Sequence, residues 1–216
     1  CHFPTFRGAM EAAQHIVKLE PQAVELVDDT MIALARDISL FQDTVKRFVK
    51  GDPAALLLVE FADDDPALNL SKLDDLENLM GELGYAFSSS GNRCGGAVSI
   101  TDISLQNDVA ELRKAGLNIM MSMKQEGKPV SFVEDCAVAL PDLADYTAGL
   151  TDIFHRHGTK GTWYAHASVG CLHVRPILNV KLEQDVATMR AIAEECFDLV
   201  QRYKGSHSGE HGDGIL

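Results

Sequence analysis

Apolar residues recur at every third or fourth position in several stretches of the chain, which is the spacing of one face of an α-helix. One such stripe of leucine and methionine runs from Leu73 to Leu83, with Ser71 as a cap before it and Gly84 as a stop after it. On this basis we expect helices over residues 12–19, 30–38, 41–49, 71–83, 105–115, 141–155 and 184–203.

Shorter apolar runs bounded by turn residues predict strands. The segments 161–169 and 172–178 flank a short turn, so they predict a β-hairpin, whose strands must pair antiparallel. Other extended segments are expected at residues 23–27, 55–61, 85–88, 98–103 and 130–134. Helices that return between strands, together with a hairpin, indicate an α+β fold, in which helices pack on an antiparallel sheet, partly ferredoxin-like.

Composition narrows the functional classes. The formal net charge is −13, and an acidic surface repels phosphate backbones, so nucleic acid is not an expected partner. No apolar run is long enough to span a bilayer. The five cysteines are scattered, without a CxxC pair, which favours a reducing, cytoplasmic compartment and argues against an iron–sulfur cluster in this segment.

Two histidines stand at the expected hairpin, His166 before the turn and His173 after it. In a symmetric hairpin they would face each other directly, with their Cβ atoms about 5 Å apart on one face of the sheet. Two imidazoles in that position can share a metal ion, although an extra residue in the turn would change the register.

A glycine-rich tail, residues 208–214, offers a carboxylate and another imidazole at Glu210 and His211. Two histidines and one carboxylate with open positions suit zinc, manganese or ferrous iron. Adjacent residues seldom both reach one ion, so Glu210 as a ligand leaves His211 to act as a base. Spacing alone leaves a second interpretation open, in which these histidines are packed or surface residues and the tail is only a loop.

The ordered motifs Lys128–Asp135, Tyr164–Pro176 and Ser208–Gly212 resemble the C-terminal domain of FAD-linked oxidases. That family includes D-lactate dehydrogenases, D-2-hydroxyglutarate dehydrogenases and glycolate oxidase flavin subunits. The segment Tyr164–Pro176 is most similar to long bacterial members that are fused to an iron–sulfur module.

The resemblance implies that residues 1–216 form the substrate, or cap, domain of a larger flavoprotein, with FAD bound mainly by an N-terminal domain that this segment does not contain. The start at Cys1 and the end just after a polar loop agree with this expectation. His166, His173 and Glu210 would hold a divalent ion, usually zinc. His211 would take the proton of the C2 hydroxyl of a D-2-hydroxy acid while a hydride passes to FAD.

The resemblance also implies a substrate-binding role for Arg113, which matches a family arginine that contacts the substrate. Arg175, two residues beyond His173 on the same strand face, is a second candidate, because a guanidinium binds a carboxylate in a bidentate manner. For both arginines, surface solvation or an ordinary ion pair is the alternative.

Beyond this segment the resemblance implies an electron acceptor, an iron–sulfur cluster and, in the full-length protein, a peripheral position at the inner membrane. Residues 168–171 depart from the Gly-Asp-Gly-Asn of many relatives, and Arg175 replaces a substrate-binding asparagine. These departures keep the ligands but put the substrate in doubt, and Arg175 would suit a second carboxylate.

Two other functions remain open from the sequence. A metallohydrolase would use a metal-bound water, and it would show hydrolytic activity without flavin. A non-catalytic ligand-binding domain would carry a degenerate site, and it would bind neither a metal ion nor a hydroxy acid.

Overall fold

A computed structural model describes residues 1–87, 95–133 and 135–212. Its sheet is antiparallel throughout, with the strand order β1-β3-β2-β6-β7-β4 and with β5 also paired to β7. The strands are β1 (His2–Phe3), β2 (Ala23–Asp28), β3 (Ala55–Glu60), β4 (Lys128–Pro129), β5 (Cys136–Ala137), β6 (Gly161–His166) and β7 (Cys171–Leu178). The predicted α+β class is confirmed.

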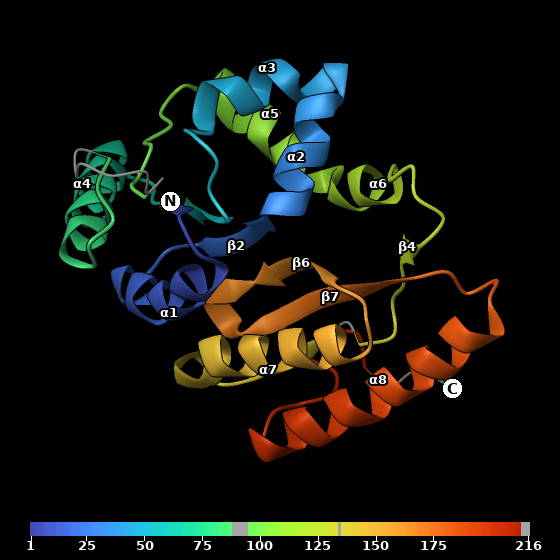
Figure 1. Ribbon diagram of the computed structural model, residues 1–216. Coiled ribbons are helices and arrows are strands. Elements are labelled where there is room, and N and C mark those ends of the chain that lie inside the picture. The colour runs from blue at the N-terminus through green and yellow to red at the C-terminus, as the bar shows by residue number, and fades with distance from the viewer. Residues whose placement is uncertain (88–94, 134, 213–216) are drawn as a thin grey trace.

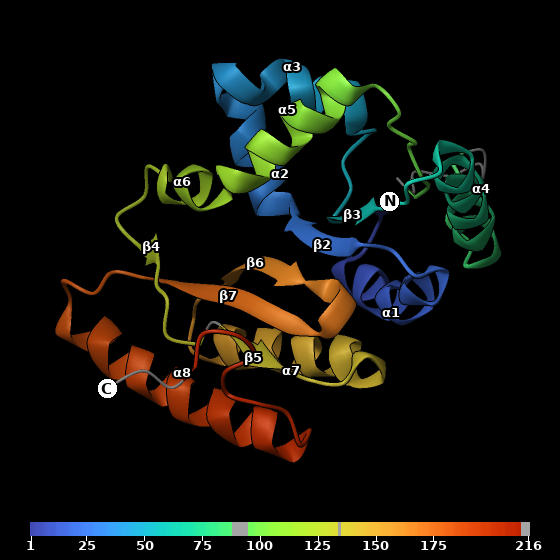
Figure 2. The ribbon, with the colours of Figure 1, turned by 180° about the vertical axis from the view of Figure 1, so that it is seen from behind.

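Helices pack on both faces of this sheet (Figures 1 and 2). The helices are α1 (Phe6–Ile16), α2 (Asp29–Asp37), α3 (Ser39–Phe48), α4 (Pro66–Glu82), α5 (Ile103–Lys114), α6 (Gly116–Met121), α7 (Leu143–Arg156) and α8 (Glu183–Arg202). Helices α1, α7 and α8 lie on one side, and α2, α3, α5 and α6 form a group on the other, over the β2 end of the sheet. No helix in the described ranges is long and apolar enough to cross a membrane.

Successive side chains of each strand point to opposite faces of the sheet, so the buried residues form two separate clusters. Leu26, Ala165 and Leu172 point toward α1 and α7 and belong to one buried cluster with Tyr146 and Phe154. The opposite face contributes Val27 and Leu56 to a second cluster with side chains of α2, α3, α5 and α6, among them Met31, Phe48, Leu112 and Ile119. The second cluster covers β2 and β3, so the polar residues of β6 and β7 on that face lie beside it.

Several helix boundaries differ from the prediction. Helix α1 begins at Phe6 because the Thr5 hydroxyl accepts from the Gly8 N–H, and it ends at Ile16 in a 3-10 turn rather than at residue 19. Helix α4 begins at Pro66, after the cap at Asp65, whereas the prediction placed its cap at Ser71. Proline at the first helical position already has the φ of a helix, and its missing N–H removes no hydrogen bond there. The pattern of apolar residues does not mark this boundary.

Three expected strands are absent from the described segments. Of the strand expected at 130–134, residue 134 lies outside the described ranges, and residues 130–133 pair in no ladder. Strand β4 ends before them and β5 begins after them, and between the two strands Asp135 has φ 86°, which breaks an extended strand. Residues 85–87 form no strand, and residue 88 lies outside the described ranges. The segment 98–102 enters no ladder either, and Ile103 already belongs to α5.

The β6–β7 hairpin is confirmed, but the predicted register is wrong. His166 lies opposite Cys171, and His173 lies opposite Tyr164. The cause is the turn, in which residues 167–169 form a 3-10 helix and Gly170 takes φ 70°. A Cβ on Gly170 would come within 2.1 Å of the Val138 carbonyl oxygen, so this turn requires glycine.

Candidate metal and substrate site

His166 and His173 share a sheet face despite the shifted register. Tyr164 lies directly opposite His173 and two residues before His166, so all three side chains project to the same side. The two imidazoles meet diagonally, with ring centroids 5.1 Å apart and ring planes at 90°. The structure therefore brings the predicted histidine pair together by a route that the symmetric-hairpin argument did not foresee.

The loop after α8 brings Glu210 onto this pair. Its Oε1 lies 2.9 Å from His173 Nε2 and 3.2 Å from His166 Nε2. Ligand atoms bound about 2.1 Å from a tetrahedral zinc ion are about 3.4 Å apart. Glu210 Oε1 thus lies from each imidazole nitrogen at slightly less than the spacing of two ligands of one ion, and these nitrogen and oxygen donors fit a divalent ion.

His211, the predicted base, lies at the edge of this cluster. Its ring stacks on His173 with centroids 5.5 Å apart, and its Nδ1 is 3.5 Å from Asp135 Oδ2. The side chain is 55 % exposed, so a substrate can reach it. The ligand atoms of Asp135, His173, Glu210 and His211 all lie within 4.8 Å of one another, which makes a second, overlapping set that could hold a metal.

Asp135 holds the tail loop in place, although the sequence alone predicted no role for it. Its carboxylate accepts from the Ser208 hydroxyl and from the backbone N–H groups of Glu210 and His211, and its backbone oxygen accepts from the Gly209 N–H. Burial alone would raise the pKa of this carboxyl, but these bonds and one from the Cys171 thiol outweigh it and lower the pKa to about 2. Because its oxygens are already engaged by donors, Asp135 suits an anchor better than a metal ligand.

Glu25 was also missed, and it connects two predicted residues. On β2 it lies opposite His166, and its carboxylate is 2.9 Å from His166 Nδ1. The same carboxylate lies 2.8 Å from Nη2 of Arg113 on α5, whose guanidinium stands 5.5 Å from the Tyr164 ring centroid. The signal available in the sequence was a glutamate placed between the apolar residues Val24 and Leu26.

Arg175 occupies the same sheet face as His173, two residues further along β7. Its Nε donates to the Ser131 hydroxyl at 2.9 Å. The structure therefore places both predicted arginines on this side of the sheet, Arg113 in contact with Glu25 and Arg175 beyond the histidine pair.

The remaining histidines differ in their surroundings. His2 is 2 % exposed because it lies in β1, and its Nε2 accepts from the Lys50 N–H. His157, at the end of α7, pairs with Glu195 at 2.7 Å. His207 packs its ring against Phe197.

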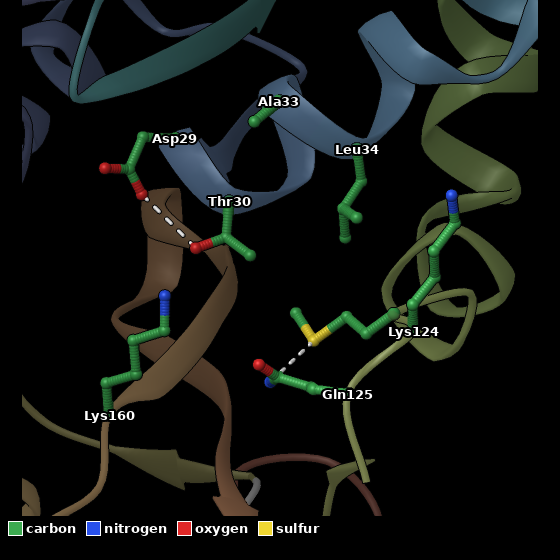
Figure 3. A pocket seen from close by; sticks show the side chains of 8 residues that line it. Asp29, Thr30, Ala33, Leu34, Lys124, Gln125 and Lys160 are labelled. Carbon is green, nitrogen blue, oxygen red and sulfur yellow. Dashed lines mark hydrogen bonds between the residues drawn. The ribbon is translucent and has the colours of Figure 1, made fainter. Parts of the chain in front are cut away.

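A pocket of about 410 Å³ opens elsewhere, between the start of α2 and the segment after α6 (Figure 3). Asp29, Thr30, Leu34, Lys124 and Lys160 are among its lining residues, and the candidate site residues do not line it. Both lysines are exposed, and Asp29 stands among them, so this pocket is not a concentrated positive site.

Comparisons with known proteins agree with these motifs. The model of the family "FAD linked oxidases, C-terminal domain" matches residues 1–216. D-2-hydroxyglutarate dehydrogenases of Pseudomonas putida and Escherichia coli are 28% and 29% identical to the chain over 99% of its length. Glycolate oxidase subunit GlcD of Bacillus subtilis is 23% identical over 92% of the chain and 38% of its own length. The chain spans about a fifth of the length of the two dehydrogenases, 21% of each.

Proposed function

This chain belongs to the family of FAD-linked oxidase C-terminal domains, and on that premise we propose that it is the substrate- and metal-binding domain of a flavin-dependent dehydrogenase. The enzyme would oxidise a D-2-hydroxy acid to the 2-oxo acid. The observation that carries the proposal is the convergence of His166, His173 and Glu210 on one sheet face, with His211 beside them.

In this proposal the chain supplies half of the active site. FAD, bound mainly by a domain outside these residues, would accept the hydride. The relatives named as D-2-hydroxyglutarate dehydrogenases support this class of reaction, and the position of the chain as one domain of a larger flavoprotein is part of the proposal.

His166, His173 and Glu210 would hold the divalent ion, for which zinc suits the mixed nitrogen and oxygen donors. When bound, the ion lowers the pKa of the substrate hydroxyl and orients it. His211 would then take the hydroxyl proton on its neutral imidazole. The exposed position of His211 at the edge of the ligand set leaves its side chain open to a substrate.

Arg113 and Arg175 would bind substrate carboxylates, because each presents a guanidinium on the site face. Two arginines on that face suit a substrate with two carboxylates, such as D-2-hydroxyglutarate, better than D-lactate or glycolate. The onward electron acceptor, an iron–sulfur cluster outside this segment, and a cytoplasmic or peripheral inner-membrane location rest on the family resemblance and stay predictions.

The test is His211→Ala in the chain joined to its flavin domain. Loss of a positioned general base lowers turnover about 10²- to 10⁴-fold, and we expect flavin content and zinc content to stay unchanged. His155→Ala, at an exposed position on α7, is the matched control and should retain full turnover. Wild-type oxidation of D-2-hydroxyglutarate, D-lactate and glycolate by His211→Ala would refute the base assignment.

Measurements on the wild-type chain decide between the two other functions. Hydrolytic turnover by the chain without flavin would identify a metallohydrolase. Absence of both zinc and hydroxy-acid binding, measured by metal analysis and calorimetry, would identify a non-catalytic domain.

A further inference from the structure

Glu25 is a buried acid in the middle of β2. Its side chain is flanked in sequence by Val24 and Leu26, and the residue is 7 % exposed. A carboxylate removed from water costs free energy unless charged or hydrogen-bonding partners replace the water. Glu25 has two such partners, and each reaches it from a different part of the fold.

The first partner is His166, directly opposite on β6. Nδ1 of the imidazole lies 3.0 Å from Glu25 Oε1 and 2.9 Å from Oε2. A carboxylate there accepts the Nδ1 proton, so the proton is held on Nδ1 and the lone pair stays on Nε2. Nε2 is the atom that points toward Glu210, at 3.2 Å. Carboxylate partners of this kind orient histidine ligands and increase their basicity.

The second partner is Arg113, which comes from α5, in the helical group that covers the β2 end of the same sheet face (Figure 1). Its Nη2 lies 2.8 Å from Glu25 Oε1, while the guanidinium carbon stands 5.5 Å from the Tyr164 ring centroid. Two contacts therefore hold a long and otherwise variable side chain in one orientation. The Arg113 side chain is 32 % exposed, so the solvent-facing part of its guanidinium can still donate to a substrate carboxylate.

We propose that Glu25 is a positioning residue that fixes the tautomer of His166 and the orientation of Arg113 at the same time. One carboxylate thereby couples the metal-binding half of the site to the half that binds the substrate carboxylate. The inference rests on the proposed function. It adds a residue of β2, Glu25, to the site.

The first test is Glu25→Gln, which keeps the shape of the side chain and removes its charge. We expect the affinity of the chain for Zn²⁺, measured by competition with a chromophoric chelator, to fall about 10- to 100-fold. Glu60→Gln, at the exposed end of neighbouring β3, is the matched control and should leave the affinity unchanged. If the wild-type chain binds Zn²⁺, an unchanged affinity in Glu25→Gln would overturn the proposal.

The second test needs no metal and separates this inference from the metal site itself. In the metal-free chain at a pH where imidazole is neutral, ¹⁵N NMR should show His166 protonated on Nδ1, and Glu25→Gln should shift part of the population to the Nε2-protonated form. A purely structural role for Glu25 would leave the tautomer unmoved, which would refute the positioning role.

The combined outcomes are distinguishable. If the wild-type chain binds no Zn²⁺ but His166 changes tautomer in Glu25→Gln, the metal proposal fails and the positioning role stands. For the second half of the proposal, calorimetry with D-2-hydroxyglutarate on the Zn²⁺-loaded chain should show weaker binding in Arg113→Ala and in Glu25→Gln. The double variant should lose less than the product of the two single losses, because both changes act on one contact. Independent, multiplicative losses would refute the coupling.

Discussion

At the scale of single residues, Asp135 shows how a side chain with no chemistry of its own can shape the site. It has φ 86°, an uncommon conformation for a residue with a Cβ, and it is 3 % exposed. The structure retains this strain where the carboxylate gathers the hydrogen-bond donors of the loop that carries Glu210 and His211. The position of the ligand and of the base therefore depends on one buried anion.

We predict that Asp135→Asn weakens Zn²⁺ binding at least tenfold and lowers the free energy of unfolding by about 1–3 kcal/mol. In this variant an amide NH₂ group would replace one of the carboxylate oxygens that now accept hydrogen bonds from the backbone N–H groups of Glu210 and His211. Chelator competition and urea unfolding measure the two effects. Ser208→Ala is the control, since it removes one bond to the same carboxylate and keeps the charge; its loss should be smaller. Equal behaviour of the two variants would contradict the anchoring role.

At the scale of elements, the β6–β7 hairpin decides how the two histidines meet. Its turn uses Gly170 in the left-handed region, packed against the Val138 carbonyl of the neighbouring segment. This turn shifts the register and converts a direct histidine pair into a diagonal one. The metal geometry is thus a property of the turn as much as of the histidines.

We predict that Gly170→Ala destabilises the chain by more than about 2 kcal/mol, because it adds a clash with backbone to the strain of a positive φ. Gly158→Ala is a matched control: Gly158 also has φ 70°, but a Cβ there meets nothing within 4 Å, so only the strain of about 1 kcal/mol applies. Urea unfolding compares the two variants. Equal losses would show that the contact with Val138 does not constrain the turn.

At the scale of the whole molecule, Asp28 ties the sheet to a helix on its second face. One carboxylate oxygen caps α2 by accepting from the Met31 N–H, and the other accepts from the Trp163 N–H of β6. Burial raises the pKa of Asp28 to about 7, against the effect of these two bonds. The folded chain therefore keeps a proton at a pH at which the unfolded chain has released it.

The sign of the pH dependence follows from linkage. The stability that this group contributes is fully present below about pH 4 and is lost as the pH rises through about 7, by at most about 4 kcal/mol. We predict that wild-type unfolding in urea shows this decline between about pH 4 and 7, and that Asp28→Asn, whose amide does not titrate, lacks it. Asp29→Asn, exposed at the next position, should decline like the wild type. Parallel curves for wild type and Asp28→Asn would contradict the assignment.

The sequence by itself determined the local features. Apolar periodicity located the long helices and the strands β2, β3, β6 and β7, because each buries one face or lies wholly in a core. It missed the start of α4, where a proline and a cap mark the boundary. It also predicted a strand over residues 130–134 from their strand-like composition, but the positive φ of Asp135 prevents an extended strand from continuing there.

For the site, the sequence identified residue types able to bind a metal, and His166, His173 and Glu210 do converge in space. It did not identify Glu25 or Asp135 as site residues, because the role of a buried carboxylate depends on the groups that it contacts. His166 is 141 residues from Glu25 in the sequence, and Glu210 is 75 residues from Asp135. Hydrophobic pattern is encoded within neighbouring residues and can be read from the chain. Register, burial of charge and the direction of a hydrogen bond arise between distant segments, so only the tertiary structure decided which carboxylates hold the site together.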